Sequence, residues 1–254
     1  MTVLLKLLGN TIFINSDRSI DYYNFIMIKI RQSFIYRNLA NITSLLGVLP
    51  LVLLFQEGGY RYLIPLIILN NVMDDLDGIL AAKLDIRSRF GANLDNVCDA
   101  VAHGILVLVV GAHYGEWVLL AGLIAAASII LRATSRVDPD SVAAGGTPTN
   151  ELMRHLLFVL LLTAIFEVTT EPYLIVIFIV HAITMALPFK LTLLIRGMAK
   201  NVTQVALVNV SLLAAWLLPL AAPFIATAFI ATYLYSFVAD GMVWLRARDN
   251  KTVL

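Results

Sequence analysis

Long apolar segments separated by short polar breaks run along the chain from residue 39 onward. Each segment has roughly 17 to 24 residues, the length that an α-helix needs to cross ~30 Å of hydrocarbon. The predicted spans are residues 39–56, 61–83, 92–113, 116–133, 152–168, 172–189, 202–218 and 221–244. The pattern therefore predicts an all-α fold, a polytopic membrane helix bundle with about eight transmembrane helices.

The first 38 residues have a different pattern, and we divide the chain into an N-terminal segment, 1–38, and a transmembrane domain, 39–254. Between residues 22 and 36, apolar positions such as Phe25 and Ile28 mix with Lys29 and Arg31. Such mixing predicts either an amphipathic helix at the membrane interface or a cytosolic segment that leads into the first span. No small-residue cleavage site follows the first apolar run, so we expect no cleaved signal peptide.

Composition supports a membrane protein and argues against nucleic acid as a partner. Hydrophobic residues make up 60% of the chain and charged residues 14%, and the formal net charge is only +1. Membrane lipids are therefore the expected surroundings. The single cysteine, Cys98, excludes an intramolecular disulfide and is expected to be a buried packing residue.

The distribution of basic residues predicts the orientation in the membrane. With a cytosolic N-terminus, the outer breaks hold Arg61 as their only basic residue, together with four glutamates. The inner segments hold Lys29, Arg31, Arg37, Lys83, Arg87, Arg89, Arg132, Arg136, Arg154, Lys190, Arg196, Lys200, Arg246, Arg248 and Lys251. We therefore expect both termini on the cytosolic side, together with the adjoining ends of the second and third spans.

Four aspartates interrupt the second and third spans at those ends: Asp74, Asp77, Asp95 and Asp99. The spacings i, i+3 and i, i+4 place each pair on one helical face, so two antiparallel helices can direct all four carboxylates to one point. An isolated charge at membrane depth costs at least ~2.5 kcal/mol, so a cation is expected among them. Oxygen ligands without His or Cys favour Mg²⁺ or Mn²⁺.

The stretch DDLDGILAAKLDIRSRFGANLDNVCD follows the pattern D-x2-D-G-x2-A-x9-G-x3-D-x3-D, which resembles the signature of the CDP-alcohol phosphotransferases. The matching positions are Asp74, Asp77, Gly78, Ala81, Gly91, Asp95 and Asp99. The resemblance implies transfer of a phosphatidyl-type group from a CDP-linked lipid to a small polar alcohol, with release of CMP. It further implies two Mg²⁺ or Mn²⁺ ions on the four aspartates, Asp99 as the base that removes the acceptor proton, and a homodimer. Ala82 departs from the family, which usually has Arg there.

Small residues and two polar residues are the candidates for nucleotide binding. Gly78, Ala81 and Gly91 would let a nucleotide approach the helix backbone, although small residues in membrane helices also serve packing. Asn41 and Ser44 open the first span in a way that is similar to the Pro-Asn-x-x-Thr start of the family, and they are also good helix caps.

The acceptor is predicted from weaker likenesses. Leu94-Asp95-Asn96, Val101, Gly104 and the segment 146–149 (Gly-Thr-Pro-Thr) resemble the phosphatidylserine synthase branch, which favours L-serine. Candidate acceptor contacts are Arg132, Arg136 and His103, with Asp138 and Asp140 as partners for an ammonium group. Inositol, inositol phosphate, glycerol phosphate and choline stay open as acceptors, because Arg132, Arg136 and Arg154 could also form a basic pocket for a phosphate. Lys83 and Arg87 are further candidates for phosphate contacts.

Other classes of protein also place carboxylates in membrane spans. A cation-coupled transporter would have its site near the midplane, on broken helices from internal repeats, and no such repeat is visible. An intramembrane prenyltransferase would carry its second aspartate motif far downstream of the first. An inactive family member, with Ala82 for Arg, and aspartates that merely pair with Lys83, Arg87 or Arg89 are the remaining alternatives. Release of CMP distinguishes the enzyme from all of them.

Overall fold

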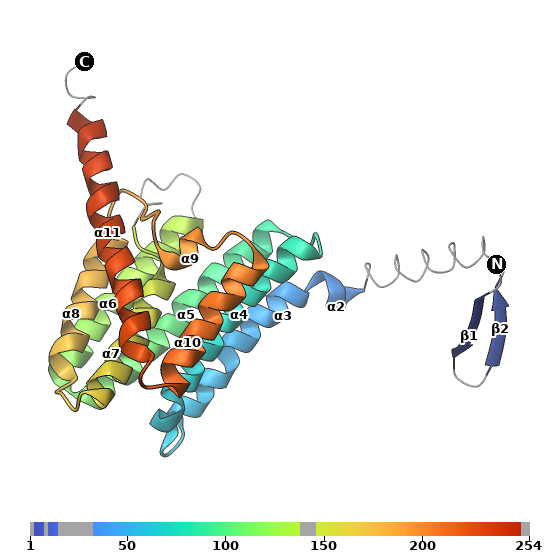
Figure 1. Cartoon of the computed structure of the whole chain (residues 1–254), viewed down its shortest axis with the longest axis horizontal. Helices are drawn as coiled ribbons and strands as arrows, with labels where there is room; N and C mark the ends of the chain where they lie inside the picture. The colour runs from blue at the N-terminus through green and yellow to red at the C-terminus, as the bar shows by residue number, and fades with distance from the viewer. Residues whose placement is uncertain (1–2, 8–9, 15–32, 138–145, 250–254) are drawn as a thin grey trace.

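The computed structural model describes residues 3–7, 10–14, 33–137 and 146–249, and its main body is a bundle of helices (Figure 1). Three of the described helices are long and apolar enough to cross a membrane: α5 (Arg89–Tyr114), α6 (Glu116–Val137) and α11 (Ala222–Asp249). Shorter apolar helices lie at Leu39–Phe55, Glu171–Met185 and Val202–Leu217. The chain is therefore an integral membrane protein, and the number of eight transmembrane helices stays a prediction.

Helices nevertheless lie on every range that the hydropathy pattern predicted. The first range holds α3 (Leu39–Val48), which tightens into the 3-10 helix η1 (Leu49–Phe55) where Pro50 lacks the N–H that an α-helix would use. A second 3-10 helix, η2 (Gly59–Tyr62), leads into α4. The remaining helices are α4 (Leu63–Lys83), α7 (Thr149–Ile165), α8 (Glu171–Met185), α9 (Ile195–Met198) and α10 (Val202–Leu217).

The described residues of the predicted transmembrane domain are helical, as expected, and the N-terminal segment adds two short strands that were not predicted. Strands β1 (Val3–Leu7) and β2 (Asn10–Ile14) pair antiparallel, with Val3 opposite Ile14 and Leu7 opposite Asn10. Of the amphipathic helix predicted between residues 22 and 36, the part up to residue 32 lies outside the described residues. The short helix α2 (Phe34–Arg37) is described, and it begins at Ser33, whose hydroxyl accepts the N–H of Tyr36 at 3.2 Å.

Local signals set the ends of the helices that carry the site. The hydroxyl of Ser88 accepts the N–H of Gly91 at 2.9 Å and caps the start of α5, and Gly115, at φ 108°, follows its last residue. Asn201 and Gln204 form a reciprocal capping box that starts α10. These caps satisfy backbone groups that the first or last turn of a helix leaves without partners.

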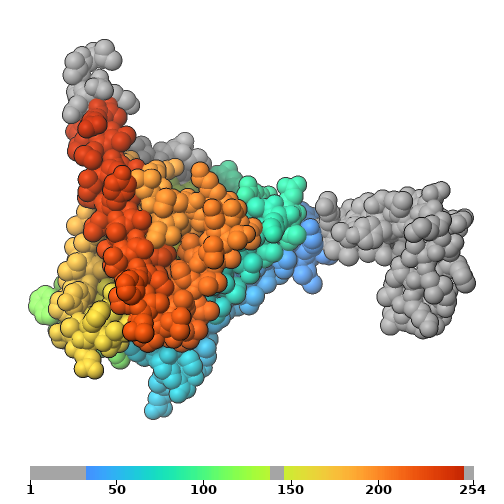
Figure 2. Space-filling model, viewed as in Figure 1, coloured from blue at the N-terminus to red at the C-terminus, as the bar shows by residue number. Residues whose placement is uncertain are grey.

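The core of the bundle lies around α7, which contacts α4, α5, α8, α10 and α11. Leu156, Leu157 and Phe158 on α7 have no exposed surface. The hairpin of α5 and α6 packs closely because Gly111 lacks a side chain, and a Cβ there would lie 2.7 Å from Leu119 Cα. In the view of Figure 2, α10 and α11 cover the near face of the bundle, and α11 extends beyond it. The central position of α7 matters below because its first turn faces the aspartates.

Candidate active site

The turn between α4 and α5 brings the two aspartate pairs together. The N–H of Ile86 donates to the carbonyl of Ala81 at 3.1 Å, and Asp85 adopts φ 55°, a left-handed conformation that reverses the chain within a few residues. Asp74 and Asp77 on α4 therefore lie beside Asp95 and Asp99 on α5.

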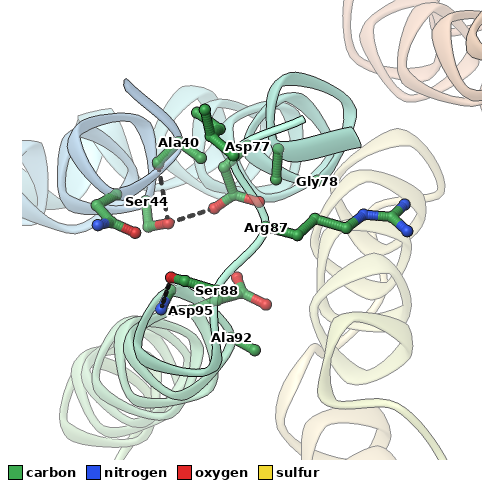
Figure 3. Close-up of a pocket in the computed structure, with 12 residues that line it drawn as sticks. Ala40, Ser44, Asp77, Gly78, Arg87, Ser88, Ala92 and Asp95 are labelled. Atoms are coloured by element: carbon green, nitrogen blue, oxygen red, sulfur yellow. Dashed lines mark hydrogen bonds between the residues drawn. The ribbon is translucent and has the colours of Figure 1, made fainter. Parts of the chain in front are cut away.

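Three of the four carboxylates form one cluster. Asp74, Asp95 and Asp99 each offer an oxygen, and these oxygens lie within 4.8 Å of one another. Asp77 is outside this group of three: it is buried, accepts the hydroxyl of Ser44 at 2.5 Å, and lies across from Asp95 (Figure 3). The structure thus brings three of the four predicted ligands together, and the fourth, Asp77, lies across from Asp95.

The composition of this cluster fits a hard divalent cation. Carboxylate oxygens are the ligands that Mg²⁺ and Mn²⁺ prefer. Within the described residues, Asp95 Oδ1 is buried and has no hydrogen-bond partner. A buried carboxylate oxygen without a partner is costly, and a bound cation would remove that cost.

A cavity of about 280 Å³ adjoins the cluster at Asp95, and every residue predicted to bind nucleotide lines it. Figure 3 shows this cavity. It is lined by Ala40, Asn41, Ser44, Asp77, Gly78, Ala81, Ile86, Arg87, Ser88, Gly91, Ala92 and Asp95. A Cβ on Gly78 would meet nothing within 4 Å, so the space beside this glycine is open. A Cβ on Gly91 would lie 3.0 Å from Asn41 Oδ1, so this glycine keeps α3 and α5 close.

Arg87 is the basic residue of this cavity. Among the described residues that line the cavity, Arg87 alone has a cationic side chain, and neither Ala82 nor Lys83 reaches it. Figure 3 shows the side chain extending from the α4–α5 turn away from Ser44, and it is largely exposed. An exposed arginine at a cavity edge can swing toward an anion without losing another partner.

A second cavity, of about 240 Å³, is lined by all three aspartates of the cluster, and Asp95 lines both cavities. Its acidic lining residues include Asp74 and Asp99. Its basic lining residues are Arg136, Arg154 and Arg196. Two cavities that meet at a carboxylate cluster can hold two substrates with their reacting groups side by side.

Hydrogen bonds that the sequence did not predict fix the walls of the second cavity. Arg196 Nε pairs with Asp75 Oδ1 at 2.5 Å, and Asn209 donates to the other oxygen of Asp75 at 2.7 Å. Asn150 donates to Asp74 Oδ2 at 2.5 Å. Asp75 and Asn150 belong to no recognised motif, and their partners are 121 and 76 residues away along the chain. No short-range spacing in the sequence could therefore have indicated these contacts.

Of the residues predicted to contact the acceptor, two arginines lie near Asp99 and His103 lies elsewhere. Arg132 and Arg136 line a small pocket that includes Asp99, and Arg136 also lines the second cavity. His103 is buried beside Asn70, with 3.0 Å between Nε2 and Oδ1, and lines neither of the two cavities that share Asp95. This contact gives His103 a role in packing α4 against α5. Asp138 and Asp140 lie outside the described residues.

Comparison with protein families identifies the segment that holds this arrangement. The family model for CDP-alcohol phosphatidyltransferase matches residues 37–189, more than half of the chain. The matched segment runs from the end of α2 to just beyond α8 and includes all four aspartates. No curated protein matches the chain.

Proposed function

This chain belongs to the CDP-alcohol phosphatidyltransferase family, and we propose that it transfers a phosphatidyl group from CDP-diacylglycerol to the hydroxyl of a small polar acceptor, releasing CMP. The observation that carries the proposal is the pair of cavities that share Asp95, one lined by small residues and one by arginines. Donor and acceptor would occupy separate cavities that meet at Asp95.

The donor nucleotide occupies the first cavity. Gly78 and Ala81 leave room for it beside α4, while Asn41 and Ser44 offer polar groups from α3. Arg87 is within reach of the pyrophosphate, whose negative charge needs a cation in a membrane protein. The family usually has an arginine at the position of Ala82. Arg87, five residues further along the chain, would supply the positive charge that is missing there.

Asp74, Asp77, Asp95 and Asp99 hold two Mg²⁺ or Mn²⁺ ions in this proposal. The ions, when bound, neutralise the pyrophosphate and stabilise the attacking and leaving oxygens of an in-line displacement. The distance between the oxygens of Asp74, Asp95 and Asp99, within 4.8 Å, supports a shared site. Asp77 joins it from the wall of the donor cavity, next to Asp95.

Asp99 acts as the base, because it lines the acceptor cavity and belongs to the acidic cluster. It accepts the proton of the acceptor hydroxyl as the acceptor oxygen forms a bond to the lipid-linked phosphorus. The bond from that phosphorus to the CMP oxygen breaks, and CMP leaves with the electron pair. Arg136 lies close enough to Asp99 to stabilise its charge before the proton arrives.

L-serine is our first choice of acceptor. Its carboxylate needs a cation, which Arg136 offers, and its ammonium needs an acidic partner, for which Asp138 and Asp140 are the candidates from the sequence. A phosphorylated polyol is the second candidate, because three guanidinium groups line this one cavity. Two of these groups already pair with carboxylates, Arg154 with Glu151 and Arg196 with Asp75, which reduces the positive charge available for a dianion.

Release of CMP from CDP-diacylglycerol tests the proposal. Purified protein with Mg²⁺ or Mn²⁺ should release CMP when the right acceptor is present, and excess chelator should abolish the release. Asp99→Asn should lower turnover by about a hundredfold or more, the range expected for loss of a general base, while the helical circular dichroism stays unchanged. Full activity in Asp99→Asn would refute the assignment of the base, and activity in excess chelator would refute the metal site.

A panel of labelled acceptors tests whether the chain belongs to the phosphatidylserine synthase branch. Serine, inositol, inositol phosphate, glycerol phosphate and choline are each offered with CDP-diacylglycerol, and label in lipid is measured. We expect label from serine. Label from another acceptor alone would show that the reaction is right and the branch is wrong, and a transporter would incorporate none.

We further propose that both termini and both cavities face the cytosol and that the protein is a homodimer. The orientation is supported by the inner location of most basic residues, and soluble acceptors and CMP are cytosolic. The dimer rests on resemblance to the family alone.

A further inference from the structure

Asp74, the first aspartate of the cluster, has a neighbour on another helix. The side-chain amide of Asn150, in the first turn of α7, donates to Asp74 Oδ2. A carboxylate only accepts, so the amide nitrogen must face Asp74. The amide oxygen of Asn150 lies 3.5 Å from the hydroxyl of Thr149, which agrees with that orientation.

The segment before Asn150 is fixed firmly to the rest of the bundle. Gly146 has φ +78°, and a Cβ there would lie 2.3 Å from the carbonyl oxygen of Met185. Its N–H donates to the carbonyl of Phe189 at 2.7 Å, and the N–H of Thr147 donates to that of Thr184 at 3.1 Å. Backbone bonds therefore tie residues 146–147 to the end of α8 and to the segment that follows it.

Tyr233 of α11 completes this anchor. Its hydroxyl lies 2.7 Å from Thr184 Oγ1 and 3.3 Å from Thr147 Oγ1. Its ring contacts those of His155 and His181, with centroids 4.9 and 5.0 Å away, and only 3% of the residue is exposed. The start of α7 is thus held from both α8 and α11, so the position of Asn150 is set by the bundle and not by its own loop.

We propose that Asn150 is a positioning residue that fixes the orientation of Asp74 and thereby completes the cation site, and that Tyr233 holds the turn that carries Asn150. One oxygen of Asp74 is occupied by the amide, which leaves the other free to face Asp95 and Asp99. Without the amide, the Asp74 side chain gains rotamers that point away from the cluster. Partners of this kind commonly change metal affinity 10- to 100-fold.

The inference rests on the metal site of the proposed function, so its test measures metal binding without substrate. Mn²⁺ affinity is determined by electron paramagnetic resonance on the full-length protein in detergent. Asn150→Ala is expected to weaken Mn²⁺ binding at least tenfold, and Asn150→Gln, which keeps the amide, to lie closer to the wild type. Tyr233→Phe removes only the hydroxyl and should show a smaller loss in the same direction.

Asn209→Ala is the matched control. It also removes an asparagine that donates to an aspartate of α4, but that aspartate is Asp75, which is not in the cluster of three. Its Mn²⁺ affinity should equal that of the wild type, whatever happens to stability.

Each outcome has a definite meaning. Unchanged Mn²⁺ affinity in Asn150→Ala, or an equal loss in Asn209→Ala, would overturn the role of Asn150 while the proposed function stands. If Asn150→Ala does not fold, Asn150→Leu, which keeps the size of the side chain and removes the amide, takes its place, and wild-type Mn²⁺ affinity there overturns the role of Asn150. Wild-type affinity in Tyr233→Phe overturns the anchoring. If the wild type itself binds no Mn²⁺, the proposed metal site fails, and this inference fails with it.

Discussion

A single glycine decides how much room the donor cavity has. Gly78 lies on α4, and a side chain there would project into the space where we place the nucleotide. Gly78→Leu is therefore expected to abolish CDP binding, measured by calorimetry, without a loss of stability, because leucine favours a helix by about 0.8 kcal/mol over glycine. Gly104→Leu is the control: a Cβ at Gly104 also meets nothing within 4 Å, but Gly104 does not line the cavity. If Gly78→Leu retains its affinity for CDP, the nucleotide does not bind beside Gly78.

Arg87 provides a second test at the scale of one residue. If its guanidinium meets the pyrophosphate, Arg87→Gln should weaken binding of CDP by about tenfold, about 1.4 kcal/mol, and leave binding of cytidine unchanged. Arg89→Gln removes an exposed positive charge two residues away that does not line the cavity, and it should change neither affinity. Equal losses for CDP and cytidine in Arg87→Gln would show that this arginine contacts the nucleoside or supports the fold.

Between elements, the pair of Asp75 and Arg196 links α4 to α9, and Asn209 of α10 joins the same carboxylate. Asp75 is buried while Arg196 keeps 32% of its side chain exposed, so loss of the pair should cost about 1–2 kcal/mol and not the larger cost of a fully buried ion pair. A double-mutant cycle with Asp75→Asn and Arg196→Gln, followed by thermal unfolding in detergent, measures the coupling. Additive effects of the two substitutions would show that the contact does not contribute.

For the molecule as a whole, the orientation in the membrane can be tested by labelling. In a Cys98→Ala background, Lys200→Cys should react only with a reagent that enters the cytosol, and Glu57→Cys only with one applied outside. Both positions are exposed and lie in connections on opposite sides of the predicted bundle. Labelling of position 200 from outside would reverse the orientation and separate the site from cytosolic CMP.

Most of the helices could be predicted because hydropathy acts along short stretches of chain. A run of about 20 apolar residues is visible in the sequence, and each predicted range holds a helix. The aspartates were visible for the same reason, since i, i+3 and i, i+4 spacing places them on one face. The strands β1 and β2 were missed because the first apolar run was considered only as a possible signal peptide.

Contacts between distant residues were not visible in the sequence. Asn150 and Asp74 are 76 residues apart, and Arg196 and Asp75 are 121 apart, so no periodic pattern connects them. Both depend on how α7, α9 and α10 pack against α4. The sequence therefore indicated the chemistry of the site better than the side chains that hold it in place.

Tyr233 also has a consequence for the order in which the protein is made. The ribosome synthesises the chain from the N-terminus, so the four aspartates and Asn150 enter the membrane well before α11 emerges. The hydroxyl that holds the turn before Asn150 belongs to α11. A chain that ends before α11, or whose α11 fails to insert, would carry all four aspartates and still lack the Tyr233 anchor. Formation of the proposed anchor therefore waits until α11 has been synthesised and inserted.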